Sequence, residues 1–202
     1  MANSETLRVF VALPLSALAH RRLEGVERKL QRACPAGVIK WVAPSKIHLT
    51  LFFLGDVMPA RLIPIREALA VVARNIPPFI VTVGGLGVFP NPRSPSVLWV
   101  GMRDSAGQLT LLHQVVNEAL AHVGFEPERR PFTPHLTLGR VRRNTASQTK
   151  SQIGEVLRGL NIGQLTTEEL TELVLFRSEL RRSGAVYTRL ATFELTGEST
   201  FS

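Results

Sequence analysis

The sequence predicts an α+β protein built on antiparallel strands, and three observations lead to this fold class. Strand-like and helix-like segments follow one another along the chain, but without the regular strand–helix–strand order of a parallel sheet. Several strand-like segments alternate apolar and polar residues, as one solvated sheet face requires. No low-complexity linker or change of composition divides the 202 residues, so we expect one domain spanning residues 1–202.

In the first half of the chain, two kinds of hydrophobic pattern alternate. β-rich runs predict strands at 7–13, 39–43, 47–54, 79–83 and 97–102. Apolar stripes at helical spacing predict helices over 16–32 and 59–74, and Pro59 opens the second of these. The stretch 84–95 is rich in glycine and proline, which predicts a loop.

The second half begins with a helix. Asp104 or Ser105 is expected to cap it, and Gly124 ends it just after Val123. Further strands are predicted at 132–141, 172–177 and 186–195, with a short helix at 149–157. The segment 166–169 matches a helix capping box, although the residues after it are strand-like. The cationic stretch 177–184 predicts a turn.

Composition limits the classes of protein that the chain can belong to. There are 24 Lys and Arg residues against 16 Asp and Glu, a formal net charge of +8, and arginine supplies 20 of the 24 cations. This excess indicates either a polyanionic partner or a genomic bias toward arginine codons. Cys34 is the single cysteine, which excludes an internal disulfide framework and a multi-thiolate metal site.

Targeting signals are not evident in the sequence. No apolar run approaches the roughly 18 residues that a membrane helix needs. The first six residues lack the basic and apolar regions of a signal peptide. We therefore expect a cytoplasmic protein without a membrane segment.

One motif, His-Leu-Thr-Leu, occurs twice, at 48–51 and at 135–138. In a strand, residues i and i+2 point to the same face, so each histidine shares a face with its threonine while the leucines point to the core. A half-buried strand explains the leucines, but it does not explain the same polar pair in the same order on two strands. We expect His48, Thr50, His135 and Thr137 to meet in one cleft.

These four side chains suit the hydrolysis of a phosphate ester. Because the pKa of histidine is near 6.5, one imidazole can be neutral and accept a proton while the other is charged and donates one. Threonine hydroxyls can donate hydrogen bonds to phosphate oxygens. Arg140 follows the second motif and could pair bidentately with the phosphate.

The sequence resembles the two-histidine (2H) phosphoesterase superfamily, and within it the RNA 2′,3′-cyclic phosphodiesterases, also known as 2′-5′ RNA ligases. Besides the two motifs, the blocks that carry the resemblance are RVFVAL from Arg8, WV from Trp41, GVFP from Gly87, VLWVG from Val97, the run from Phe132 to Arg140, and the late segment from Arg177 to Tyr187. Gly139 occupies a position where a small alanine is common in that family.

The resemblance implies a bilobal fold, in which two pseudo-symmetric antiparallel-sheet lobes with outer helices surround a central cleft. It implies hydrolysis of a terminal RNA 2′,3′-cyclic phosphate to a 2′-phosphate, without metal or other cofactor. In that family His48 would be the proton donor and His135 the proton acceptor. From their chemistry, Thr50, Thr137 and Arg140 are expected to bind the substrate. The expected partner is RNA with such an end or a small cyclic nucleotide, and no obligate protein partner is evident.

Other functions stay open at this point. The same site could act on ADP-ribose cyclic phosphate or 2′,5′-linked oligonucleotides, or the fold could be a non-catalytic nucleotide- or RNA-binding module. A metal hydrolase that uses His48 and His135 as ligands is disfavoured, because no carboxylate or cysteine stands nearby at ligand spacing.

Several other side chains have two possible roles. Arg129 and Arg130 belong either to a solvated rim or to an RNA-backbone contact. Phe89 and Trp41 are expected in the core rather than against a base. His20 is expected to be solvated, because it lies beside two arginines on a helix.

Overall fold

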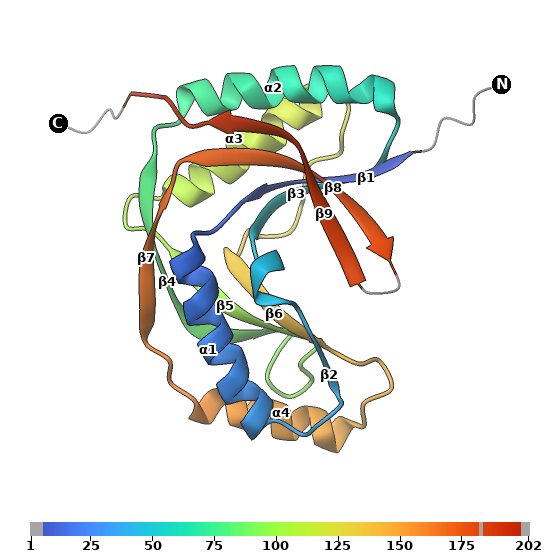
Figure 1. Cartoon of the computed structure of the whole chain (residues 1–202), viewed down its shortest axis with the longest axis vertical. Helices are drawn as coiled ribbons and strands as arrows, with labels where there is room; N and C mark the ends of the chain where they lie inside the picture. The colour runs from blue at the N-terminus through green and yellow to red at the C-terminus, as the bar shows by residue number, and fades with distance from the viewer. Residues whose placement is uncertain (1–5, 182–183, 199–202) are drawn as a thin grey trace.

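The computed structural model describes residues 6–181 and 184–198, in which a single curled sheet is flanked by helices (Figure 1). Its strands are β1 (Leu7–Leu13), β2 (Ile39–Trp41), β3 (Leu49–Val57), β4 (Phe79–Phe89), β5 (Val97–Arg103), β6 (His135–Val141), β7 (Gln164–Leu170), β8 (Glu172–Arg181) and β9 (Gly184–Glu194). The helices are α1 (Ala17–Ala33), α2 (Leu62–Asn75), α3 (Gln108–His122) and α4 (Ser147–Gly159), with 3₁₀ turns η1 (Pro44–Lys46) and η2 (Pro59–Arg61).

The sheet consists of two halves of antiparallel strands. Its order is β7-β4-β5-β6-β3-β1-β8-β9, and β2 pairs with β6 beside this path. The halves β7-β4-β5-β6 and β3-β1-β8-β9 join where β6 meets β3, through the pair formed by Leu49 and Leu136. The predicted α+β bilobal class is confirmed, with the two lobes as halves of one sheet.

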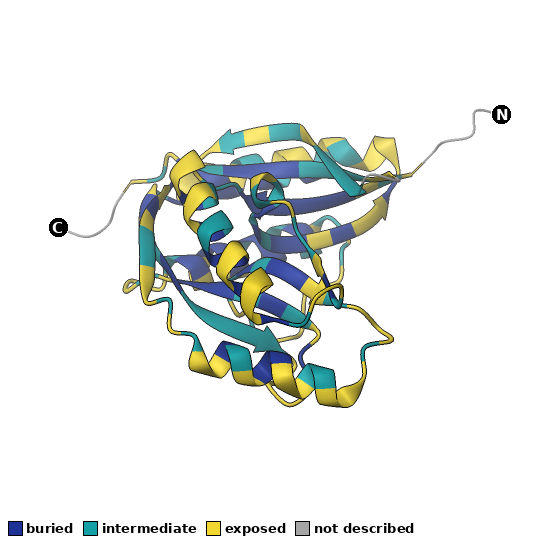
Figure 2. Ribbon diagram, turned by 60° about the horizontal axis from the view of Figure 1, so that its bottom comes forward, coloured by how far each residue is buried: buried dark blue, intermediate teal, exposed yellow. Residues whose placement is uncertain are grey.

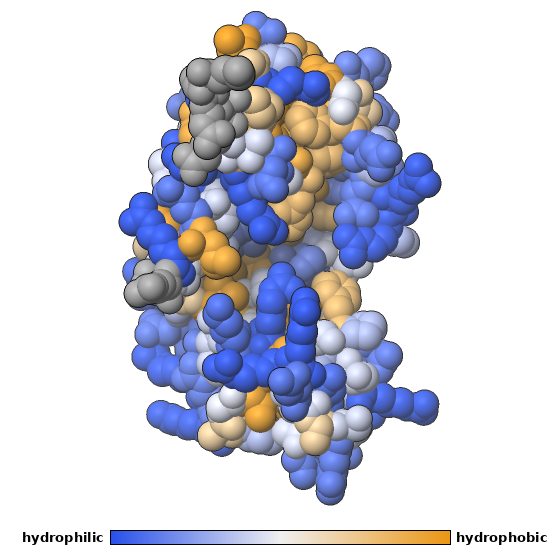
Figure 3. Space-filling model, turned by 90° about the vertical axis from the view of Figure 1, so that its right-hand side faces the viewer, coloured by the Kyte–Doolittle hydropathy of each residue, from blue (hydrophilic) through white to orange (hydrophobic). Residues whose placement is uncertain are grey.

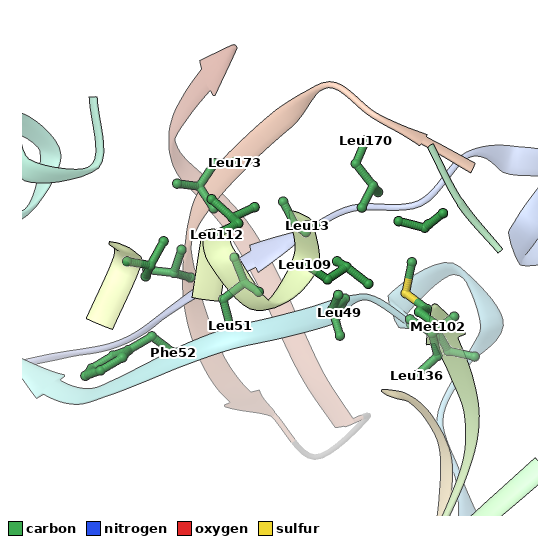
Figure 4. Packing of buried hydrophobic residues seen from close by; sticks show 14 of the residues in the cluster. Leu13, Leu49, Leu51, Phe52, Met102, Leu109, Leu112, Leu136, Leu170 and Leu173 are labelled. Carbon is green, nitrogen blue, oxygen red and sulfur yellow. The ribbon is translucent and has the colours of Figure 1, made fainter. Parts of the chain in front are cut away.

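The helices cover the outer faces of the two halves. α2 and α3 pack against each other and against β3, β8 and β9, whereas α1 packs on β7 and α4 on β4 (Figure 1). More than half of the residues of β1, β3 and β5 are buried, while each helix keeps an exposed outer stripe (Figure 2). Leu49 and Leu51 of β3 lie beside Leu109 and Leu112 of α3 (Figure 4). Burying each such leucine contributes about 1.5–3 kcal/mol.

Helix α1 forms close to where its sequence pattern predicts. Leu23, Val26 and Leu30 of its apolar stripe are buried, and the Ser16 hydroxyl caps its first turn by accepting from the Ala19 amide. Ser16 also donates, through its amide and its hydroxyl, to the buried carboxylate of Glu168 on β7. These bonds fix the start of α1 against the opposite half of the sheet.

Several local predictions are wrong or shifted. The predicted loop 84–95 is strand as far as Phe89, because Gly85, at φ 75°, forms a bulge that keeps β4 paired with β5. The predicted capping box 166–169 lies inside β7, where pairing with β4 overrides the local helix signal. Strand β6 begins at His135 rather than at Phe132. Helix α3 begins at Gln108, although Asp104 still accepts from the Gly107 and Leu109 amides.

The predicted turn at 177–184 is mostly strand, since β8 continues to Arg181 and β9 begins at Gly184. Residues 182 and 183 of that predicted turn lie outside the described residues. Residues 1–5, on which the prediction of no signal peptide mainly rests, also lie outside them. Within the described residues no helix is long and apolar enough to cross a membrane.

Candidate active site

The two His-Leu-Thr-Leu motifs meet where the halves of the sheet join. Leu49 pairs with Leu136 in antiparallel register, so each motif runs past the other about a local twofold axis. The leucines are buried, and the alternation of a strand turns His48, Thr50, His135 and Thr137 to the opposite face. The predicted alternation of the two motif strands is therefore present in the structure.

A β-bulge follows the first motif and changes which side chains share its face. Strand β1 pairs with Thr50 and then with Phe52, which leaves Leu51 without a partner. One extra residue reverses the later alternation, so Phe53 rather than Phe52 lies on the face of Thr50. Phe52 is 5% exposed in the core, whereas Phe53 is 66% exposed.

The second motif carries the same bulge. Strand β5 pairs with Thr137 and then with Gly139, leaving Leu138 without a partner. The bulge turns Arg140 to the face of Thr137, as it turns Phe53 on the other strand. Gly139 packs closely here, because a Cβ there would lie 2.8 Å from Ile39 and 3.1 Å from Trp41, so that even alanine requires these side chains to shift.

The site face borders two cavities. A cavity of about 750 Å³ is lined by Thr50, His135, Thr137, Arg140 and Phe53, among others. His48 lines a smaller cavity, of about 350 Å³, with His20, Lys46, Tyr187 and Arg189. The structure thus brings four of the five predicted site residues around one cavity, and His48 borders the second. The face seen in Figure 3 is hollowed between a more hydrophobic upper part and a mostly hydrophilic lower part.

Each motif histidine is held by the backbone carbonyl two residues before it. The Nδ1 atoms of His48 and His135 lie 2.8 Å from the Lys46 oxygen and 2.7 Å from the Thr133 oxygen. Because a carbonyl only accepts, Nδ1 carries the proton in both rings, and Nε2 is the proton acceptor of each neutral ring. Either ring can therefore accept a proton when neutral or donate one when charged.

Aromatic rings surround both imidazoles. His48 stacks on Phe10, with ring centroids 4.9 Å apart, and meets the edge of Tyr187 at 5.2 Å. His135 meets Phe89 edge-on at 4.9 Å and Trp99 at 6.1 Å. The prediction that Phe89 belongs to the core is wrong, because Phe89 is only half-buried, packs against a site histidine and lines the larger cavity.

This burial lowers the pKa of both histidines below its ordinary value. For His48, desolvation has the largest effect, the Lys46 carbonyl opposes it, and the charge of His20 lowers the pKa further. For His135, desolvation is again the largest cause, the Thr133 carbonyl opposes it, and Arg140 lowers the pKa further. Both rings are therefore biased toward the neutral form in the free protein.

Sequence reasoning misses the residues that support His48. His20, predicted to be solvated, is half-buried, and its Nε2 lies 3.0 Å from the Ile47 oxygen, directly before the motif. Lys46 donates to the Ala185 carbonyl and so ties η1 to β9. Of the residues around His48, Tyr187 could have been noticed in the sequence, because it lies in a segment that resembles the family, but the sequence does not indicate its role.

The remaining sequence candidates lie at the edges of the larger cavity. Arg130 lines it and forms an ion pair with Glu128 at 2.8 Å. Arg129 is exposed and is not among the lining residues. Trp41 is partly buried against Gly139, in agreement with its predicted place in the core. In the part of the chain that the structure describes, no three His, Cys, Asp or Glu side chains gather as a metal site would require.

Comparison with known proteins shows close relatives of this chain. An RNA 2′,3′-cyclic phosphodiesterase of Archaeoglobus fulgidus is 33% identical over 93% of this chain and 100% of its own length. That of Aquifex aeolicus is 31% identical over 93% of this chain and 95% of its own. That of Geobacillus stearothermophilus is 34% identical over 93% of this chain. The match covers only 57% of the length of that relative.

Solved structures show the same fold. TT0787 of Thermus thermophilus matches with a TM-score of 0.79 at 25% identity, covering 96% of this chain and all of the other. LigT of Escherichia coli complexed with 3′-AMP matches with a TM-score of 0.71 at 28% identity, covering 95% of this chain and 99% of the other.

The profile of the family described as LigT like Phosphoesterase matches twice, over residues 13–99 and 100–187. Each matched segment contains one of the two motifs, and together they span most of the chain. The chain therefore belongs to the LigT-like phosphoesterase family.

Proposed function

We propose that this protein is an RNA 2′,3′-cyclic phosphodiesterase that converts a terminal cyclic phosphate to a 2′-phosphate, with His48 and His135 as its paired acid and base. The observation that supports the proposal is the local twofold pairing of the two motifs, with Thr50, His135, Thr137 and Arg140 around one cavity and His48 at the border of the next. The relatives named RNA 2′,3′-cyclic phosphodiesterase support the choice of substrate.

In the proposed reaction His135 is the base. Its Nε2 takes a proton from water as the water oxygen bonds to phosphorus, and the nearby positive charge of Arg140 favours the neutral ring that this step needs. Thr50 and Thr137 donate to the non-bridging oxygens while negative charge builds on them. Arg140, on the same face, pairs with the same phosphate.

His48 is the acid in this scheme. Its ring gives the Nε2 proton to the 3′-oxygen as the bond from that oxygen to phosphorus breaks. Burial and His20 lower the pKa of His48 in the free protein, so the phosphate must supply the negative charge that makes the imidazolium stable. Because the residues themselves provide both proton transfers and the oxyanion donors, we propose a reaction that needs no metal.

The test is incubation with an oligoribonucleotide that ends in a 2′,3′-cyclic phosphate, in excess chelator, with the product end identified. We expect a 2′-phosphate and undiminished turnover in chelator. A panel with ADP-ribose cyclic phosphate and a 2′,5′-linked oligonucleotide separates the related activities. Binding of the RNA without any ring opening contradicts the proposal and supports a non-catalytic module.

A further inference from the structure

The segment that leads into the second motif has no regular structure of its own. Residues 125–134 lie between α3 and β6, and none of them belongs to a helix or strand. This segment nevertheless includes Thr133, whose carbonyl holds Nδ1 of His135 at 2.7 Å. After Thr133, the Pro134 carbonyl accepts from the Met102 amide of β5. Before Thr133, the position of the carbonyl depends on what holds the rest of the segment.

Helix α3 holds this segment at two points, one helical turn apart. The Oδ1 atom of Asn117 accepts from the Glu128 amide at 2.9 Å. The imidazole of His113 lies flat against the ring of Phe132, with centroids 4.0 Å apart and planes 7° apart. Because residues i and i+4 share a helix face, both contacts come from the same side of α3. His113 and Phe132 also line the larger cavity, as His135 does.

The side-chain amide of Asn117 joins these two contacts. Since its Oδ1 accepts from the Glu128 amide, its Nδ2 donates to the His113 carbonyl at 2.8 Å and lies 3.1 Å from Nε2 of His113. That Nε2 must then accept, which requires a neutral ring with its proton on Nδ1. Burial lowers the pKa of His113, although the charge of Glu128 opposes this effect. The buried ring is therefore neutral at neutral pH, and the Asn117 amide fixes its orientation against Phe132.

We propose that His113 is a positioning residue, whose ring, stacked on Phe132, holds the Thr133 carbonyl where it keeps the proton of His135 on Nδ1. Phe132 directly precedes Thr133, so the stack acts on that carbonyl through one peptide link. The inference rests on the proposed cyclic phosphodiesterase function, in which Nε2 of His135 takes a proton from water. A neutral ring that carries its proton on Nε2 is the wrong tautomer for this step.

The test reads the tautomer of His135 directly, from the ¹⁵N chemical shifts of its ring at about pH 8, where imidazoles of lowered pKa are neutral. In the wild type we expect the proton on Nδ1. His113→Leu fills the same space without a flat ring, and should move part of the His135 population to the Nε2–H form. On a cyclic mononucleotide its kcat should fall at least about 10-fold, because slight misplacement of a catalytic group has large effects.

Three further variants isolate the stacked pair. His113→Phe retains a flat ring against Phe132 and should restore both the tautomer of His135 and kcat. Phe132→Leu removes the same stack from the other side, and should give the same losses even if His113→Leu folds poorly. The double variant should be little slower than either single one, because both changes act through one contact. His122→Leu changes an exposed histidine of the same helix, outside the cavity lining, and should behave as wild type.

The outcomes separate this inference from the function on which it rests. If His113→Leu keeps the proton of His135 on Nδ1, the positioning role is overturned, whatever the change in rate. If His113→Phe restores neither the tautomer nor kcat, or if the losses of the two leucine variants add, the stack is not the contact responsible and the inference is overturned as well. If the wild type opens no cyclic phosphate while the tautomer still changes in His113→Leu, the proposed function is overturned and the link from His113 to His135 is supported.

Discussion

At the scale of single residues, the two motif histidines are fixed by backbone carbonyls and biased toward the neutral form. Backbone carbonyls hold Nδ1 in each ring, and aromatic neighbours remove water from both. A ring whose pKa is lowered in this way is a ready acceptor, whereas a donor must first gain a proton. In the proposed reaction, the phosphate of the substrate would supply the negative charge that raises the pKa of the donor.

The pH dependence of the reaction should show this bias. Because burial lowers the pKa of both His48 and His135, we expect a bell-shaped kcat/KM profile with its optimum below about pH 6.5. The kcat profile should lie at higher pH, since bound phosphate favours the imidazolium. Steady-state rates with a cyclic mononucleotide give both pH profiles. The two apparent pKa values of each profile belong to the pair of rings and not to one histidine each. A flat kcat/KM profile from pH 5 to 9, with chemistry rate-limiting, contradicts paired acid–base catalysis.

Arg140 should contact the reacting phosphate, so its removal should have the same effect on short and long substrates. We expect Arg140→Ala to lower kcat roughly 10²-fold for a cyclic mononucleotide and for RNA alike, as loss of one transition-state donor does. Arg140→Lys should recover only part of this, because an ammonium cannot form the bidentate pair. Arg143→Ala, an exposed neighbour, is the matched control. A loss confined to long RNA would place Arg140 in backbone binding instead.

At the scale of elements, the strands around each motif hold the histidine in place through their packing. Gly87 of β4 lies under Trp99 of β5, and a Cβ at Gly87 would overlap the indole. Trp99 in turn packs against His135 and Phe89. Gly87 is therefore needed to leave space for the indole of Trp99, which packs against His135, and not to form a turn.

Gly87→Ala should consequently damage activity more than the fold. Overpacking of this kind costs roughly 1–3 kcal/mol of unfolding free energy, measurable with denaturant. The displaced indole should lower kcat/KM at least about 10-fold, because small misplacement of a catalytic group has large effects. Gly25→Ala in α1, where a Cβ meets open space, is the control and should stabilise slightly. Wild-type kcat/KM in Gly87→Ala removes the role assigned to Trp99.

The sequence predicts those elements that local pattern determines. The leucines of the motif strands are buried as their periodicity indicates, and so is the apolar stripe of α1 except Leu18, which is 43% exposed. The Gly-rich run after 83 and the capping box at 166 mislead, because pairing of β4 with β5 and β7 decides both. The bulges at Leu51 and Leu138 leave no trace in the alternation. For this reason the sequence identifies the histidines and threonines but not Phe53.

At the scale of the whole molecule, the net charge of +8 should make the affinity for RNA increase with the length of the RNA. We expect long RNA to have a lower KM than a cyclic mononucleotide, and this advantage to shrink as salt rises. Neutralising Arg129 and Arg130 together should raise KM mainly for long RNA, since Arg130 lines the cavity rim. Titrating salt with both substrates measures this. An identical response of long and short substrates would show that these arginines are only a solvated surface.

The central claim, that the two halves of the molecule each contribute one reacting imidazole, is tested most directly by a mutant cycle. His48→Ala, His135→Ala and the double variant are compared with wild type on RNA ending in a 2′,3′-cyclic phosphate, with folding checked by circular dichroism. Each single change should lower kcat at least roughly 10²-fold, and the double variant should be little slower than the slower single one. Wild-type turnover in either folded single variant would contradict the account.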